Sequence, residues 1–215
     1  MCGRFTLRRP EKVRIKGVSQ ADLTGAHGRY NVAPSQDVLG VIQTNDERHA
    51  LHFQWGLIPS WSKEPKGFIN ARAETVAEKP SFRDSFRRRR CLIPADGFYE
   101  WRREGRTKQP FYFQMKDESV FAFAGLWDTW GKDGDKVASC AIITTKPNEL
   151  VGSVHDRMPV ILRPSDFDTW LGDEADADEL QELLAPFPAE YMQGYPVGLG
   201  VNNPGVDEPR LIARD

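Results

Sequence analysis

Long apolar runs are missing from this sequence, and Arg4, Arg8 and Arg9 stand where a signal peptide would need its apolar region. A transmembrane helix needs about 20 consecutive, mostly apolar residues, so the sequence predicts neither a membrane span nor a membrane partner. We therefore expect a cytoplasmic protein. Its 215 residues suffice for one good hydrophobic core, and we expect a single domain over residues 1–215.

Cysteine is scarce as well. The three cysteines, Cys2, Cys91 and Cys140, are widely spaced and form no C-x-x-C pair. An odd and dispersed set argues against a disulfide framework and against a structural zinc site. We expect neither a metal nor an organic cofactor.

An excess of positive charge is also missing, since the formal net charge is −2. This balance argues against a non-specific polyanion binder. The charges are unevenly spread, however, because arginines crowd residues 83–106 and acidic residues crowd residues 173–182. An arginine-rich groove with an acidic face behind it fits this pattern.

What is present is a series of short strands separated by turns, with few helices. We predict strands over residues 38–43, 50–58, 68–73, 91–94, 97–102, 110–115, 119–127, 137–145 and 195–201. We predict a turn and then a helix within residues 74–89, and helices over residues 164–171 and 175–184. The pattern indicates one α+β domain with a largely antiparallel β-core.

Cys2 is the residue of the chain with the widest range of possible reactions. Once the initiator methionine is removed, an α-amine and a thiol would stand on adjacent carbons. Their reference pKa values of about 7.7–8.0 and about 8.5 leave both groups partly nucleophilic near neutral pH. Such a pair attacks an acyl carbon, or captures an aldehyde as a five-membered thiazolidine. The alternative is a terminal cysteine without a function.

Two further side chains suit proton transfer. Glu100 lies between Tyr99 and Trp101 on a predicted strand, where the aromatic rings would desolvate the carboxylate and raise its pKa. His155 follows a predicted short helix, and histidine moves protons near neutral pH. The alternatives are an arginine-paired carboxylate at a strand edge and a structural histidine.

Asn70 and Arg72 alternate along an extended segment and therefore project to the same side. An amide and a guanidinium on one face can orient a nucleophile and hold a phosphate. The alternatives are a turn asparagine and a salt-bridging arginine. We interpret the arginine run at residues 87–90 as the solvated C-terminal end of a helix.

Five sequence blocks occur in a fixed order along the chain. They are Cys2-Gly3-Arg4, Arg29–Pro34, Asn70–Glu74, Gly97–Trp101 and His155–Pro159. Together they closely resemble the SOS response-associated peptidase (SRAP) family, and the resemblance extends to Asn202 and Asn203. Each block alone is a weak signal, whereas five in order are specific. The resemblance implies an α+β fold with a barrel-like, mainly antiparallel β-core flanked by short helices.

The resemblance also implies a function in the DNA damage and SOS response. The protein would recognise abasic sites in single-stranded DNA and form a covalent crosslink through Cys2, with Asn70, Glu100 and His155 around it. The implied DNA-binding residues are Arg4, Asn31, Pro34, Trp61, Arg72 and Arg157. We expect a cytoplasmic monomer, associated with the nucleoid when it is bound to DNA.

Other chemistries also begin with this cysteine. The family name records an older proposal of thiol autoproteolysis after Met1. N-terminal-nucleophile glutamine amidotransferases also start Met-Cys-Gly, but they usually continue with isoleucine where this chain has Arg4. A cysteine peptidase would use Cys2 and His155 with Asn70 or Glu100. A single-stranded DNA-binding module with an incidental cysteine is the non-enzymatic alternative.

Overall fold

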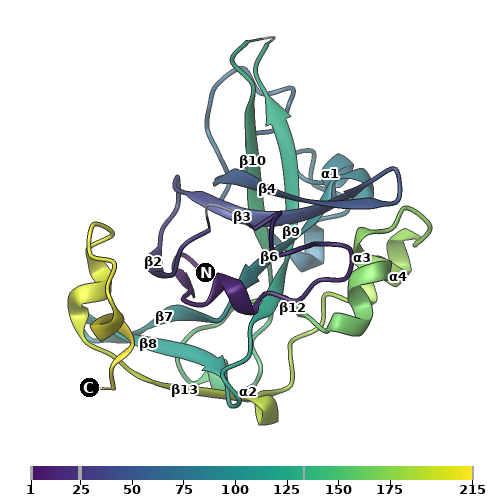
Figure 1. Cartoon of the computed structure of the whole chain (residues 1–215). Coiled ribbons are helices and arrows are strands. Elements are labelled where there is room, and N and C mark those ends of the chain that lie inside the picture. Colours follow the sequence, from purple (N-terminus) through teal and green to yellow (C-terminus); the bar gives the residue numbers. More distant parts are fainter. Residues whose placement is uncertain (1, 24–25, 133, 215) are drawn as a thin grey trace.

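Two β-sheets form the framework of the structure, a computed structural model that describes residues 2–23, 26–132 and 134–214 (Figure 1). The strands are β1 (Phe5–Leu7), β2 (Arg29–Val32), β3 (Asp37–Thr44), β4 (Glu47–Trp55), β5 (Asn70–Arg72), β6 (Arg90–Ala95), β7 (Gly97–Glu104), β8 (Thr107–Met115), β9 (Phe121–Trp130), β10 (Val137–Thr145), β11 (Met158–Pro159), β12 (Ile161–Leu162) and β13 (Met192–Pro196).

Helices are short throughout the described residues. The α-helices are α1 (Arg83–Arg88), α2 (Glu149–Gly152), α3 (Phe167–Leu171) and α4 (Ala177–Glu182). The 3-10 turns are η1 (Pro10–Lys12), η2 (Ala73–Thr75), η3 (Pro164–Asp166), η4 (Ala189–Tyr191), η5 (Leu199–Asn202) and η6 (Pro209–Ile212). Within the described part of the chain, no helix has the length and apolarity needed to cross a membrane.

A closed barrel forms the centre of the molecule. Strands β4, β3, β6, β9 and β10 pair in that order, and β10 returns to pair with β4. All of these pairings are antiparallel except the parallel pairing of β10 with β4. The second sheet, β13-β8-β7-β1-β2, is antiparallel throughout. The predicted α+β fold with a barrel-like, mainly antiparallel core is confirmed.

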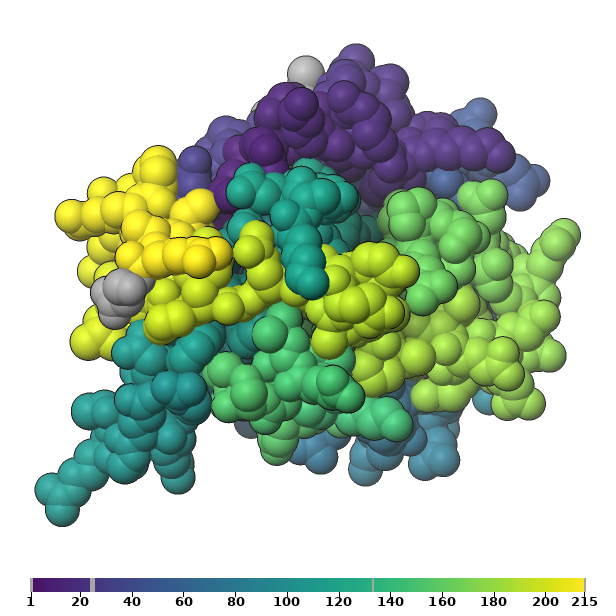
Figure 2. Space-filling view, turned by 90° about the horizontal axis from the view of Figure 1, so that it is seen from below, coloured from purple at the N-terminus to yellow at the C-terminus, as the bar shows by residue number. Residues whose placement is uncertain are grey.

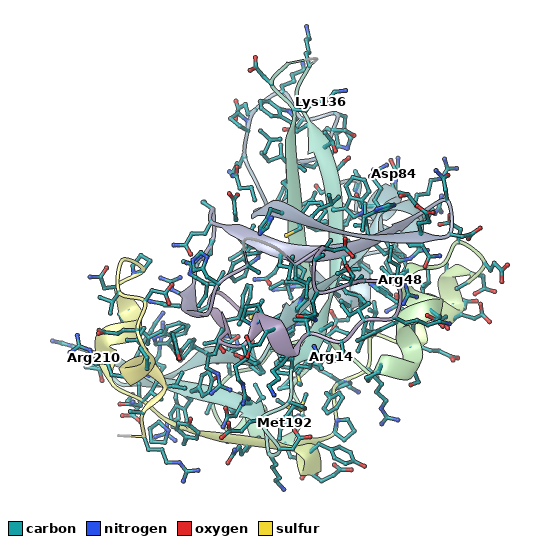
Figure 3. The ribbon with its side chains drawn as sticks, viewed as in Figure 1. Arg14, Arg48, Asp84, Lys136, Met192 and Arg210 are labelled. Carbon is teal, nitrogen blue, oxygen red and sulfur yellow. The ribbon has the colours of Figure 1, made fainter. Side chains whose placement is uncertain are left out.

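Strands β6, β9 and β10 of the barrel are buried on both faces over most of their length, whereas much of β4 is exposed. Along β9, Phe123 packs into the core shared with the second sheet, and Ala124 packs into the core shared with α1, α3 and α4. The same alternation places Cys140 and Ala141 of β10 on opposite faces. Burial on both sides explains why these strands are almost continuously apolar. Charged side chains such as those of Lys136 and Arg210 lie at the periphery (Figure 3).

Several predicted boundaries were wrong. The strand predicted over residues 50–58 ends at Trp55, because Gly56 adopts a φ of 144° and turns the chain. The final strand is Met192–Pro196, and residues 199–202 form η5 instead of continuing it. The short strand β1 was not predicted.

The arginine run at residues 87–90 does not form a uniformly solvated helix end. Arg87 and Arg88 are exposed, but Arg90 is only 5% exposed. Its guanidinium donates to the carbonyls of Phe86 at 2.8 Å and of Trp170 at 2.7 Å, so it satisfies carbonyls at the ends of both α1 and α3.

Candidate functional site

The register of β1 against β7 brings the start of the chain to Glu100. Phe5 pairs with Phe98, and the Tyr99 amide donates to the Arg4 carbonyl at 3.0 Å. Because the strands are antiparallel, the residues before Arg4 run toward the residues after Tyr99. Cys2 is completely buried at this position.

Asn70, at the start of β5, holds Cys2 from another direction. Its side-chain amide donates to the Cys2 carbonyl at 2.9 Å. Strand β5 lies parallel to β10, with Asn70 opposite Ile142, so the barrel fixes the position of this amide. Arg72, two residues further along β5, is exposed.

Glu100 and His155 lie together beside Cys2. The distance between His155 Nε2 and Glu100 Oε2 is 3.9 Å. Glu100 is only 1% exposed, and burial raises its pKa to about 7. This carboxyl group can therefore both donate and accept a proton near neutral pH.

Local hydrogen bonding orients the His155 ring. The Arg157 amide and an Asp156 carboxylate oxygen each lie 3.0 Å from Nδ1, and these contacts leave Nε2 as the nitrogen that faces Glu100. Burial lowers the pKa of His155, while the nearby Asp156 carboxylate acts in the opposite direction. The lowered pKa favours the neutral ring.

The Cys2 thiol is protonated in the resting protein. Burial raises its pKa, and the nearby Glu100 charge raises it further. A base must therefore take the thiol proton as the sulfur reacts. Glu100 is the carboxyl group close enough to influence that proton.

An open depression of about 650 Å³ leads to these residues. It is lined by Gly3, Arg4, Glu100, Trp101, Thr107, Lys108, His155, Leu199 and Asn202. Sequence reasoning missed Lys108, which adds positive charge to the depression beside Arg4. The hairpin that carries Lys108 was predicted, but its proximity to the first residues of the chain depends on the β7–β1 pairing.

Three more of the predicted DNA-binding residues are accessible, to different degrees. Trp61 is 61% exposed, Pro34 is half-buried, and Arg4 is half-buried with its guanidinium donating to the Gly3 carbonyl at 2.9 Å. Burial lowers the pKa of Arg4.

Arg157 already has a carboxylate partner. Its guanidinium nitrogens lie 2.6 and 2.9 Å from the two carboxylate oxygens of Glu74, and it also donates to the Thr144 carbonyl. The bidentate bond lowers the pKa of Glu74. A phosphate contact from Arg157 stays a prediction.

Asn31 is completely buried, and its direct contact with DNA stays a prediction. Its side-chain amide donates to the carbonyls of Asn203 at 3.0 Å and Val206 at 2.8 Å. These bonds hold the C-terminal segment against β2, and Figure 2 shows that segment in yellow beside the purple N-terminal part. Asn31 therefore has a structural role here.

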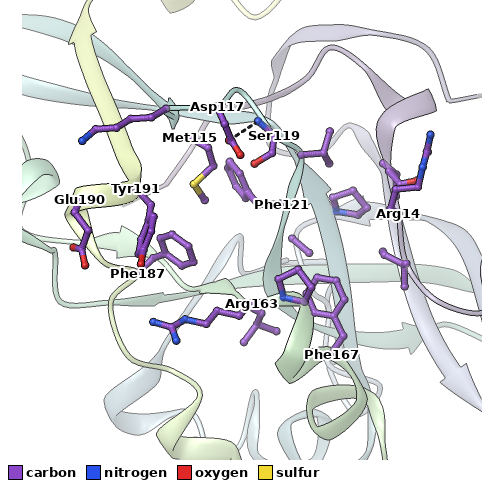
Figure 4. Close-up of a pocket in the computed structure, with 18 residues that line it drawn as sticks. Arg14, Met115, Asp117, Ser119, Phe121, Arg163, Phe167, Phe187, Glu190 and Tyr191 are labelled. Atoms are coloured by element: carbon purple, nitrogen blue, oxygen red, sulfur yellow. Dashed lines mark hydrogen bonds between the residues drawn. The ribbon is translucent and has the colours of Figure 1, made fainter.

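A separate apolar pocket of about 350 Å³ lies away from these residues (Figure 4). Phe121, Phe167, Phe187 and Tyr191 contribute aromatic surface, and Arg163 lies at its edge. None of the predicted site residues lines it.

The fold and the site together define an α+β protein with a closed β-barrel, in which Cys2 lies beside a buried carboxylate, an amide and an imidazole. Comparison with known families agrees with this class. The family model described as "SOS response associated peptidase (SRAP)" matches residues 1–204. The chain belongs to this family.

Its relatives are named as abasic site processing proteins. YoqW of Bacillus subtilis is 46% identical over 221 residues that cover 99% of each chain. YedK of Escherichia coli is 33% identical, covering 82% of this chain and 80% of YedK. A solved structure of a Bacteroides thetaiotaomicron protein matches with a TM-score of 0.84, 31% identity and complete coverage of both chains.

Proposed function

We propose that this protein binds single-stranded DNA at abasic sites and captures the sugar aldehyde covalently with Cys2. The main observation in support is that Asn70, Glu100 and His155 lie around Cys2, beside an open depression. The names of the relatives support abasic-site processing. The reaction needs the free α-amine of Cys2 and hence removal of Met1, which lies outside the described residues.

The first bond forms between nitrogen and carbon. An abasic deoxyribose is mostly a closed hemiacetal, and Glu100 with His155 would move protons to and from the ring oxygen to favour the open aldehyde. The Cys2 amine then attacks C1′ to give a carbinolamine. Protonated Glu100 donates to its hydroxyl, water leaves, and an imine remains.

The second bond forms between sulfur and the same carbon. Positive charge on the protonated imine favours ionisation of the adjacent thiol, whose pKa is raised in the free protein. Glu100 or His155 takes the thiol proton, the sulfur adds to C1′, and the imine nitrogen becomes the amine of a thiazolidine. Asn70 orients Cys2 for both steps. Loss of the imine suppresses the β-elimination that would break the strand.

A narrow set of positive and aromatic side chains would bind the strand. Arg4 and Lys108 line the depression, and Arg72 and Trp61, which are exposed, would extend this surface. Base stacking contributes about 1–3 kcal/mol per base, so a strongly basic protein is not required. We propose that the protein acts as a monomer in the cytoplasm, on the nucleoid.

A denaturing gel tests this function. Met1-free protein is incubated with a single-stranded oligonucleotide that contains one abasic site. We expect a shifted band with the parent protein and no shifted band with Cys2→Ala. Cys140→Ala, a matched change at another buried cysteine, should still give the band. A trimmed protein that gives no band contradicts the proposal, and release of ammonia from glutamine, or cleavage of peptides, would support acyl chemistry instead.

A further inference from the structure

A buried polar cluster lies beneath the chain segment that follows Cys2. Asp96 is completely buried, and its carboxylate accepts from the Thr6 hydroxyl at 2.6 Å and from the amides of Arg8 and Arg9 at 2.7 and 3.2 Å. Because the Thr6 hydroxyl gives its proton to Asp96, Tyr112 must donate in the 2.9 Å bond between the Tyr112 and Thr6 hydroxyls. All of these bonds end on or directly after β1.

Backbone pairing alone specifies the position of β1 poorly. The strand has three residues, it pairs with β7 at two residue pairs beside the backbone bonds from Tyr99 to Arg4 and from Asp96 to Thr6, and its register with β2 is irregular. A slip of one residue would move Cys2 along β7 by about 3.3 Å and turn it to the opposite face. The side-chain bonds of Thr6 resist this slip, because only one register places its hydroxyl between Asp96 and Tyr112.

The neighbouring glycine makes room for this cluster. A Cβ atom on Gly97 would lie 2.0 Å from the Tyr112 hydroxyl oxygen, closer than any allowed contact. Gly97 pairs with Thr6 across β1 and β7. The Asp96-Gly97 bend thus supplies both the acceptor and the space that the Tyr112 hydroxyl occupies.

We propose that Thr6, Asp96 and Tyr112 form a clamp that sets the position of Cys2 against Glu100. They are positioning residues that touch neither DNA nor the reacting atoms. The inference rests on the proposed function, because its catalytic consequence is the alignment of the Cys2 amine and thiol.

Thr6→Val tests the clamp, since valine keeps the size of the side chain and removes the hydroxyl. We expect the crosslinking rate at saturating DNA to fall about tenfold or more, because small displacements of a reacting group cost up to 10²-fold. Affinity for undamaged single-stranded DNA should change by less than about twofold, as expected for a change away from the binding surface. Tyr112→Phe is the second variant and should act in the same direction.

Tyr195→Phe is the matched control. It also removes a tyrosine hydroxyl, one that donates to the Ile212 carbonyl at 3.0 Å, and its ring packs against Tyr112. Its crosslinking rate should stay within about twofold of the parent protein. If both clamp variants stay folded and react at the parent rate, the clamp is refuted.

Thiol labelling gives a readout that does not depend on DNA. We expect an alkylating reagent to label Cys2 faster in Thr6→Val than in the parent protein, while Cys91 and Cys140 stay protected. Unchanged labelling of Cys2 would overturn the clamp even if the parent protein formed no crosslink. A parent protein that forms no crosslink, combined with faster labelling in Thr6→Val, would refute the proposed function and retain the clamp.

Discussion

Burial raises the pKa of Glu100 to about 7, so both the protonated and the ionised form of this side chain are populated near neutral pH. The protonated form can donate to a leaving hydroxyl, and the ionised form can accept the thiol proton. His155 faces the same carboxyl group through Nε2. In the proposed reaction, Glu100 is therefore the main proton donor and acceptor.

Glu100→Gln should slow crosslinking and change its pH dependence. Protonated Glu100 is lost as pH rises through about 7, and the free amine is lost as pH falls below about 7.7–8.0. We expect a bell-shaped rate profile for the parent protein and loss of its alkaline limb in the variant. The measurement is the single-turnover rate from pH 5 to 9 at saturating DNA. An unchanged profile would remove Glu100 from the mechanism.

The same substitution should stabilise the protein at alkaline pH. Because the pKa of Glu100 is raised in the folded state, the native protein binds more protons between about pH 4.5 and 7, and stability falls as pH rises through this window. Glu100→Gln removes that loss, so its free energy of unfolding at pH 8 should be higher by about 3 kcal/mol. Urea unfolding at pH 4 and pH 8 measures this, and an equal difference at both pH values would contradict it.

At the level of residues, the residue types that form the site could be predicted from the sequence, whereas the burial of individual side chains could not. The residue types and order of Cys2, Asn70, Glu100 and His155 indicated a site, and the structure brings them together. The burial of Asn31 could not be read from its block, because the C-terminal segment that covers it lies about 170 residues further along the chain.

At the level of elements, the longer strands followed from their apolar residues and turns. The short strand β1 could not be predicted in this way, because three residues are too few to show the alternating pattern of a strand. The parallel pairing of β10 with β4 and β5 also has no local signal, since it depends on how the barrel closes. The sequence therefore predicted a β-core but not the pairing that delivers Cys2 to Glu100.

Arg90 should be the stabilising member of the arginine run. Arg90→Ala would leave buried carbonyls of α1 and α3 without a charged donor, and we expect a loss of about 2–4 kcal/mol in the free energy of unfolding. The exposed Arg88→Ala is the control and should change stability by less than about 0.5 kcal/mol. Equal effects in chemical denaturation would show that the bonds of Arg90 contribute little.

At the scale of the whole molecule, the net charge is −2, so binding of DNA would depend on how the charges are distributed over the surface. Basic residues at the depression and on β5 must compensate for an acidic exterior elsewhere, including residues 173–182. Binding of single-stranded DNA should therefore weaken as salt increases.

Arg72 and Trp61 should contribute to this binding in different ways. Arg72→Ala should lower affinity for all sequences and reduce the salt slope by about 0.7, the value for one phosphate contact on a single strand. Trp61→Ala should cost about 1–3 kcal/mol with little change in slope. Leu51→Ala, at another exposed apolar residue, is the control. Fluorescence anisotropy across a salt series measures all three, and a Trp61 variant that matches the control would exclude stacking.

The most direct test of the central claim is mass spectrometry of the crosslinked, protease-digested protein after treatment with a thiol-alkylating reagent. The account predicts that the deoxyribose fragment is attached to a peptide that begins with Cys2, with the mass of one water lost and with the thiol inaccessible to alkylation. A fragment attached to a lysine, or to a Cys2 whose thiol is still alkylated, would contradict capture by both the amine and the sulfur.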